Sequence, residues 1–378
     1  MKLALVGPYP IDTSRIPGGV AAVTYYLTQG LAKFPELDVH VIAATKQVQR
    51  DETVRTGNIT VSYLSYPKTR VVPNQLRDIA RVRRVLRETK PDLVHSQTPS
   101  GADAGFQAGL PTVLTIHGIP EQERRFARGL SNRLGAALAP WLTRRALTHA
   151  DAGIAISPYV VDHYHHLKTV RWHHIANPIQ DDFFVEAGAE HPAKMLYAGV
   201  MYARKNIPGL IRAFHLIHAA NANAELFICG KVMEPQIFDW ARDYVAAHGL
   251  SSTVHLLGFV SQGELARHFS EAAVICLFSE EETAPMIIAQ AMCAAKPVIS
   301  TAAGGVPHMV ADGRTGFVVP IGDERAFADR ALQLLRDDAM RRRMGAEARE
   351  VAESRFRTDA VVRQTIDVYE AVLAARRR

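Results

Sequence analysis

The chain is poor in cysteine and has no long apolar run. These two absences argue against a disulfide-rich protein and against a membrane-spanning one. Its 378 residues include only three cysteines (Cys229, Cys276 and Cys293), and no two of them have the C-x-x-C spacing of zinc or redox sites. Disulfide scaffolds are therefore excluded, and a reducing compartment is expected. No stretch approaches the ~20 apolar residues of a membrane span, and Leu3–Val6 is too short for a signal peptide. We therefore expect a cytoplasmic protein.

Charge of one sign does not dominate the whole chain, but it does dominate the first half. The sequence has a net charge of +6 and 48% hydrophobic residues, as in ordinary soluble globular proteins. Residues 1–180 hold 22 basic and 13 acidic residues, a net charge of +9, whereas the remainder has −3. A basic half suggests an anionic partner, namely nucleic acid, an anionic membrane surface or a phosphorylated substrate. No nucleic-acid-binding motif accompanies the charge, so we expect no nucleic-acid partner.

Short apolar runs alternate with longer amphipathic segments from end to end, with no short-period repeat. Such alternation is typical of parallel sheets covered by helices on both faces, hence of doubly wound α/β domains. There are too many strands for one such unit, and the pattern restarts after Asn177-Pro178. We predict one domain over 1–177, a second over 178–357, and a final amphipathic helix over 358–378 that packs back towards the first domain. The predicted strands are Lys2–Val6, Val39–Ala43, Thr60–Tyr63, Leu93–His95, Val113–Ile116, Gly153–Ile156, Met195–Gly199, Ala224–Cys229, Val254–Leu257, Val274–Phe278, Val298–Ser300 and Phe317–Val319.

Ligands of doubly wound sheets bind beyond the carboxyl ends of the strands, and several candidate residues follow strands directly. Gly18-Gly19 precedes a predicted helix, where paired glycines and free N–H groups favour a phosphate. His117 follows a strand and can bond a substrate hydroxyl. Arg204 and Lys205 precede another helix, where cations can neutralise a diphosphate. Taken singly, the glycines are equally well explained as a flexible turn and the two cations as an exposed basic turn, and a lone histidine is more often structural.

The segment from Ser279 to Met292 is the most specific pattern. Three glutamates follow the strand Val274–Phe278, and Pro285 then begins a helix. Glu282 lies at the mouth of the strand and Gln290 lies eight positions later inside the helix, so the pair can hold one ligand at two depths. We expect one glutamate in the site and the other two to be solvated. The candidates of this segment are Glu282, Thr283, Met286, Ile287 and Gln290.

The order and spacing of these motifs resemble those of the family 4 retaining glycosyltransferases, or group 1 glycosyltransferases. The resemblance covers most of the chain, from Gly18-Gly19 to the final helix, and is strongest over Ser279–Ser300. It implies the GT-B fold, in which two Rossmann-like domains face each other across a deep cleft. It also implies an acceptor-binding first domain and a second domain that binds the nucleotide sugar.

The resemblance carries roles over to individual residues. Glu282 matches the acid that contacts the donor sugar, and Lys205 matches the lysine that binds the diphosphate. Gly19 would contact the donor phosphate together with Gly18, and His117 would contact the donor sugar.

Several positions depart from the family pattern, and two of them bear on the charge at the donor site. Gln290 stands where a second glutamate usually binds the ribose hydroxyls, so a charge-assisted hydrogen bond is replaced by a neutral one. Val200 stands where an arginine is frequent, and Arg204 is the candidate to supply that charge. Both departures leave the identity of the donor open.

The function implied is transfer of a hexose-type sugar from a UDP- or GDP-sugar to an acceptor hydroxyl with retention. The acceptor is expected to be a glycan or a lipid-linked molecule. No Asp-x-Asp occurs in the sequence, so no metal and no cofactor are expected, and the cations would stabilise the leaving diphosphate. The alternatives are a nucleotide-sugar epimerase on the same fold and a non-catalytic paralogue that binds nucleotide sugars.

Two basic amphipathic segments bear on localisation. One is Gln75–Thr89, with five arginines, and the other is Phe126–Leu147, which includes Trp141. Such helices can bind an anionic bilayer, which would make the protein peripheral on the inner face of the cell membrane. The alternative is that both helices pack on their own sheet and are solvated outside.

Overall fold

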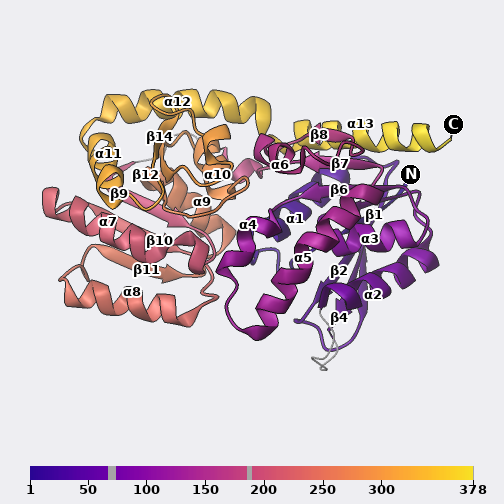
Figure 1. Cartoon of the computed structure of the whole chain (residues 1–378). Coiled ribbons are helices and arrows are strands. Elements are labelled where there is room, and N and C mark those ends of the chain that lie inside the picture. Colours follow the sequence, from indigo (N-terminus) through magenta and orange to yellow (C-terminus); the bar gives the residue numbers. More distant parts are fainter. Residues whose placement is uncertain (67–73, 185–189, 378) are drawn as a thin grey trace. The chain divides into compact units, whose positions relative to one another are not determined.

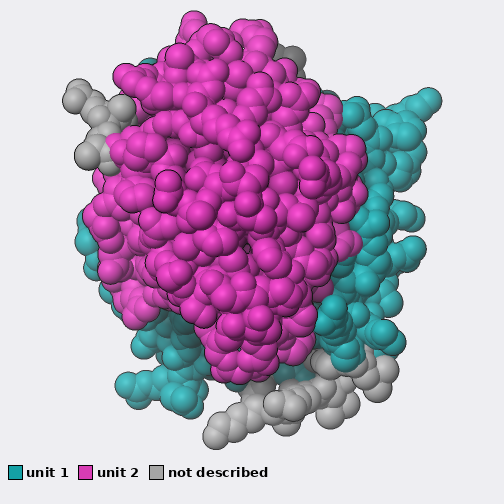
Figure 2. Space-filling model, turned by 90° about the vertical axis from the view of Figure 1, so that its left-hand side faces the viewer, with its two compact units in different colours: residues 1–11, 19–178, 358–378 teal, residues 12–18, 179–357 magenta. Residues whose placement is uncertain are grey.

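The computed structural model describes residues 1–66, 74–184 and 190–377, and it divides into two compact units (Figures 1 and 2). Unit 1 consists of residues 1–11, 19–178 and 358–378, and unit 2 consists of residues 12–18 and 179–357. Each unit is built around one sheet. The C-terminal helix therefore belongs to the same unit as the first half of the chain.

The sheet of unit 1 has the strand order β3-β4-β2-β1-β5-β6-β7-β8. All neighbouring strands are parallel except β3 and β4, which form an antiparallel hairpin. The parallel strands end at a common edge, which is where candidate residues gather. The strands are β1 (Lys2–Val6), β2 (Asp38–Thr45), β3 (Glu52–Thr56), β4 (Ile59–Ser65), β5 (Leu93–Ser96), β6 (Thr112–Ile116), β7 (Ala152–Ala155) and β8 (Trp172–His174).

Helices cover both faces of this sheet because its strands are apolar on both sides. On β1, Leu3 and Leu5 join one core cluster, whereas Ala4 and Val6 join another, as the two-residue period of a strand requires. The first cluster includes residues of α1 and α13, and the second includes residues of α2, α3 and α5. The helices of unit 1 are α1 (Gly19–Leu31), α2 (Asn74–Thr89), α3 (Pro99–Gln107), α4 (Pro120–Glu123), η1 (Arg124–Phe126), α5 (Leu130–His149), α6 (Pro158–Tyr164) and α13 (Thr358–Arg376).

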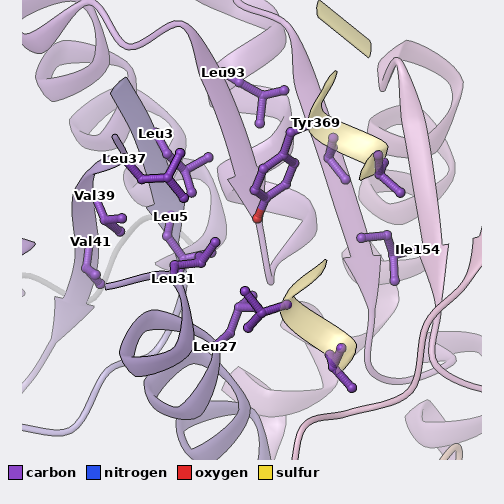
Figure 3. Packing of buried hydrophobic residues seen from close by; sticks show 14 of the residues in the cluster. Leu3, Leu5, Leu27, Leu31, Leu37, Val39, Val41, Leu93, Ile154 and Tyr369 are labelled. Atoms are coloured by element: carbon purple, nitrogen blue, oxygen red, sulfur yellow. The ribbon is translucent and has the colours of Figure 1, made fainter. Parts of the chain in front are cut away.

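The last helix, α13, completes the core of unit 1. Tyr369 is fully buried among the leucines and valines of the first cluster (Figure 3). Gly30 of α1 allows close approach of α13, since a Cβ there would lie 2.5 Å from Val362 Cγ2. Arg378, the last residue of the predicted helix, lies outside the described residues.

The sheet of unit 2 is wholly parallel, with the order β11-β10-β9-β12-β13-β14. Its central strand β12 is buried at every position, as expected for a strand covered on both faces. The strands are β9 (His191–Ala198), β10 (Glu225–Cys229), β11 (Val254–Gly258), β12 (Ala272–Leu277), β13 (Val298–Thr301) and β14 (Gly316–Val319). The helices are η2 (Asp181–Phe183), η3 (Ala203–Lys205), α7 (Ile207–Ala220), α8 (Pro235–Ala247), α9 (Gln262–Glu271), α10 (Met286–Cys293), η4 (Val306–His308), α11 (Glu324–Arg336) and α12 (Asp338–Arg355).

The predicted α/β class with two parallel-sheet domains is confirmed, and two strands are additional. β3 and β8 lie at the two edges of the sheet in unit 1. β3 is exposed at every position and β8 is only three residues long. Neither therefore carries the buried apolar run by which central strands are recognised.

Candidate functional site

Two cations are positioned in unit 2 by the turn that follows β9. After Ala198 the chain passes through η3, which carries Arg204 and Lys205. Asn206 then adopts a left-handed conformation (φ 45°) and caps α7, its Oδ1 accepting from the N–H of Gly209 at 3.0 Å. The cations are therefore fixed immediately before a helix N-terminus, where the helix dipole favours negative charge.

A carboxylate is positioned by the loop that follows β12. The hydroxyl of Ser279 donates to Glu282 Oε1 at 2.7 Å, and the backbone N–H of Gly305 donates to the Glu282 carbonyl at 2.8 Å. The Thr301 hydroxyl in turn donates to the Ser279 carbonyl at 2.5 Å. Glu282 is thus held from the ends of both β12 and β13.

The cations and the carboxylate form one buried cluster. Lys205 Nζ forms an ion pair with Glu282 Oε1, and Arg204 Nη1 lies 3.4 Å from Glu282 Oε2. The Glu282 side chain is 3% exposed, against 12% for Lys205 and 17% for Arg204. Arg204 Nη1 also donates to the Glu281 carbonyl at 2.7 Å. The predicted pair of cations and the predicted glutamate are therefore brought together. The expectation that the other two glutamates are solvated is wrong for Glu281, which is 4% exposed.

The cluster keeps Glu282 ionised. Burial alone would raise the pKa of its carboxyl, but Lys205 and Arg204 outweigh burial and hold the pKa below its usual range. The buried phenol of Tyr197, close to this carboxylate, has a pKa raised well above its ordinary value, so it stays neutral. Two cationic side chains sharing one carboxylate beside a helix start can bind an anionic ligand.

The remaining candidates of the acidic segment lie on or near α10. Thr283, Ile287 and Gln290 are buried, at 4%, 4% and 7% exposure, and Met286 is half-buried. Pro285 lies at the N-cap position of α10, so the predicted helix start is found.

The paired glycines are divided between the two units. Gly18 belongs to unit 2, has φ 148°, and a Cβ added to it would lie 3.9 Å from Val200 Cγ2. The segment 12–18 is attached to unit 2 by the Arg15 guanidinium, which donates to the Phe259 carbonyl at 3.0 Å. Gly19 begins α1 in unit 1.

His117 lies in unit 1, directly after β6. Its Nε2 lies 2.6 Å from Gln97 Oε1, and Gln97 Nε2 lies 3.1 Å from Nε2 of the buried His95. Burial lowers the pKa of His117 to about 4, so the ring is neutral at physiological pH. His95 and Gln97 were not predicted as site residues from the sequence. The signal for them is that β5 and β6 are adjacent parallel strands, so the residues at the end of β5 lie next to those that follow β6.

The two basic helices of unit 1 both pack on their sheet and expose apolar side chains. Val82 and Leu86 of α2, with Leu142 of α5, are buried in the second core cluster. Leu134 and Trp141 of α5 are 61% and 56% exposed. Among the described residues, no helix combines the length and apolarity that a bilayer crossing requires.

Two protein-family models together match most of the chain. The family model "Glycosyl transferases group 1" matches residues 178–351, and "Glycosyltransferase Family 4" matches residues 17–183. The chain is 25% identical to α-maltose-1-phosphate synthase of Mycolicibacterium smegmatis, over 99% of this chain and all of that protein. It is 31% identical to N-acetyl-α-D-glucosaminyl L-malate synthase of Bacillus anthracis over 45% of this chain and 43% of that protein.

Solved structures show the same fold over nearly the whole chain. Sucrose-phosphate synthase from Thermosynechococcus elongatus superposes with a TM-score of 0.81 at 21% identity, covering 99% of both chains. Anabaena HepE, solved with UDP and glucose, superposes with a TM-score of 0.76 at 18% identity, covering 98% of this chain and 99% of that one. At these identities the likeness establishes the fold.

Proposed function

Because the chain belongs to the family 4 (group 1) glycosyltransferases and has their GT-B fold, we propose that it transfers a hexose-type sugar from a UDP- or GDP-sugar to an acceptor hydroxyl, with retention at the anomeric carbon. The observation that carries this proposal is the convergence of Lys205 and Arg204 on Glu282 in unit 2. A diphosphate leaving group needs positive charge, and this cluster supplies it beside the start of α7. HepE, which shares the fold, was solved with UDP and glucose.

The chemical difficulty of the reaction is the charge that develops on the departing diphosphate. Lys205 and Arg204 would stabilise that charge, in a preorganised and largely buried setting where such stabilisation is strongest. Their charge makes the proposed transfer independent of a metal or a resident cofactor. Glu282 would bind hydroxyls of the donor sugar, and His117 would contribute a further hydrogen bond to the same sugar.

Retention follows from attack on the face that the leaving group departs from. The bond between the anomeric carbon and the phosphate oxygen breaks, and the acceptor oxygen forms its bond on the same face. The acceptor proton passes to the departing phosphate, which acts as the base, so no covalent intermediate on the protein is required.

A panel of UDP- and GDP-hexoses tests this function through release of the nucleoside diphosphate, with and without glycan acceptors and in the presence of a chelator. We expect release that depends on the acceptor, and a product whose anomeric configuration by NMR equals that of the donor. Release without acceptor would favour the epimerase, and binding without release would favour the non-catalytic paralogue. A strict requirement for metal would contradict the mechanism.

Lys205→Met is the informative variant, with Arg212→Met as its control. Removing a preorganised charge at the leaving group is expected to lower kcat by about 10²–10³-fold. Arg212 lies on α7, the helix that follows Lys205, but it pairs with Glu324 at 2.7 Å on the surface of unit 2, so its loss should leave turnover unchanged. Equal rates for both variants would remove the diphosphate assignment.

We propose further that unit 1 binds an acceptor linked to, or presented by, an anionic membrane surface. The support is the exposure of Leu76 on α2 and of Leu134 and Trp141 on α5. Leu76 and Trp141 also line a cavity of about 330 Å³ together with Arg83 and Arg145. Flotation with vesicles that contain anionic lipid should recover the protein at low salt, and Trp141→Ser should reduce the recovered fraction. No binding at low salt would end this part of the proposal.

A further inference from the structure

A buried chain of polar side chains in unit 1 lies behind His117 and has no part in the proposed transfer. His95, Gln97 and Tyr369 are 1%, 4% and 0% exposed. His95 Nδ1 lies 2.6 Å from the Tyr369 hydroxyl, and Gln97 bridges His95 to His117 with contacts of 3.1 and 2.6 Å. These hydrogen bonds thus connect the C-terminal helix α13 to a candidate donor-binding residue.

The chemistry of the Gln97 amide fixes the direction of each hydrogen bond. Its Nε2 can only donate, so His95 Nε2 must accept, and its lone pair is shared between the Gln97 amide and the Thr115 hydroxyl, which donates at 2.7 Å. A neutral His95 then carries its proton on Nδ1 and donates it to the Tyr369 hydroxyl. The Gln97 Oε1 can only accept, so His117 must carry its proton on Nε2.

Both rings are neutral, and only a neutral imidazole has two tautomers, since a protonated ring carries a hydrogen on both nitrogens. Burial lowers the pKa of His95 to about 3 and that of His117 to about 4. Each ring therefore has one N–H and one lone pair at neutral pH.

We propose that Tyr369, His95 and Gln97 are positioning residues that hold His117 as the Nε2–H tautomer, so that its Nδ1 accepts a hydrogen bond from a hydroxyl of the donor sugar. The role of the sugar rests on the proposed function. The tautomer itself is a property of the protein without donor.

The chain of hydrogen bonds has a second state, which removal of the Tyr369 hydroxyl should populate. Without that acceptor, the Nδ1–H of His95 has lost its hydrogen bond. The tautomer with the proton on Nε2 is then favoured, because it can donate to the Thr115 hydroxyl. The Gln97 amide must then turn, and its Nε2 would donate to His117 Nε2, which places the His117 proton on Nδ1. A cavity of about 20 Å³ borders His95, Gln97 and Thr115, so there is space beside the amide.

Long-range ¹H–¹⁵N correlation spectra of the full chain labelled with ¹⁵N-histidine read the tautomers directly, with His117→Gln and His95→Gln variants to assign the signals. We expect His117 as Nε2–H and His95 as Nδ1–H in the wild type, and a shift of His117 towards Nδ1–H in Tyr369→Phe. Tyr164→Phe is the control, because it deletes another buried hydroxyl of unit 1, which donates to Glu121 at 3.0 Å. The control should leave both tautomers unchanged.

Kinetics supply the second readout. Tyr369→Phe should lower kcat/KM for the donor by about tenfold, equivalent to about 1.4 kcal/mol, whereas Tyr164→Phe should not. A wild-type His117 in the Nδ1–H form, or a His117 signal indifferent to Tyr369→Phe, would overturn the proposal. The expected tautomers in a protein that turns over no donor would support the hydrogen-bond chain and count against the proposed function alone.

Discussion

Lys205→Met is expected to destabilise unit 2 through the carboxylate that it leaves behind. Glu282 is 3% exposed, so the variant strands a buried negative charge with Arg204 at 3.4 Å and the Ser279 hydroxyl at 2.7 Å. Breaking a buried ion pair by removing one partner costs about 3–5 kcal/mol of unfolding free energy. Because Glu282 keeps two other partners, we expect a loss at or just below the lower limit of this range, about 2–3 kcal/mol.

The double variant Lys205→Met/Glu282→Gln separates this electrostatic loss from a packing defect. The amide keeps a hydrogen-bond acceptor for Ser279 without carrying charge, so the double variant should be more stable than Lys205→Met alone. A double-mutant cycle should give a coupling energy of about 1–3 kcal/mol, and catalysis should stay lost.

Urea unfolding followed by fluorescence provides the assay. Trp240 is the single tryptophan within 179–357, so it reports on unit 2 once Trp141 and Trp172 are replaced by phenylalanine in every variant. Additive effects of the two substitutions would refute the buried ion pair.

Three further predictions concern other features. Because the pKa of Glu282 is lower in the folded protein than its unfolded value near 4.5, the ionised carboxylate stabilises the fold above pH 4.5, and this contribution is lost as the pH falls through the folded pKa. The difference in unfolding free energy between wild type and Glu282→Gln should therefore shrink below about pH 4.5. A difference that does not change with pH would contradict the lowered pKa. Gly30→Ala should lower stability by about 1–3 kcal/mol because its Cβ would overlap Val362, and Gly135→Ala, with no neighbour nearer than 3.8 Å, should not. Gln290→Glu should lower the KM for the donor, since a charge-assisted hydrogen bond is stronger than a neutral one by about 1 kcal/mol; an unchanged KM would separate Gln290 from the donor.

The sequence predicts the central strands of both sheets well, because these strands are continuous apolar runs. β1 lies where the run Lys2–Val6 predicts it, and β12 and β13 match their predicted runs within two residues at each end. The edge strand β3 could not be predicted, because an exposed edge lacks the burial that makes a strand apolar. The short helix α4 has no buried residue and hence no periodicity to find.

The candidate site could be predicted in part. Lys205 and Glu282 are 77 residues apart, and the rule that ligands lie beyond strand ends places both at the same edge of the sheet in unit 2. The support of Glu282 by Ser279, and of Ser279 by Thr301, depends on side-chain geometry that spacing does not specify. The assignment of Gly19 and His117 to donor binding stays a prediction, because both belong to unit 1, whereas the cluster of cations and carboxylate lies in unit 2.

The central claim is that the cations of η3 bind the diphosphate of an activated sugar. Calorimetric titration of UDP and GDP into the wild type, Lys205→Met and Arg212→Met, each with chelator present, tests it most directly. We predict binding of one of the two nucleotides to the wild type and to Arg212→Met, and an affinity at least tenfold weaker for Lys205→Met. Equal affinity in all three proteins, or binding that vanishes with chelator, would contradict the claim.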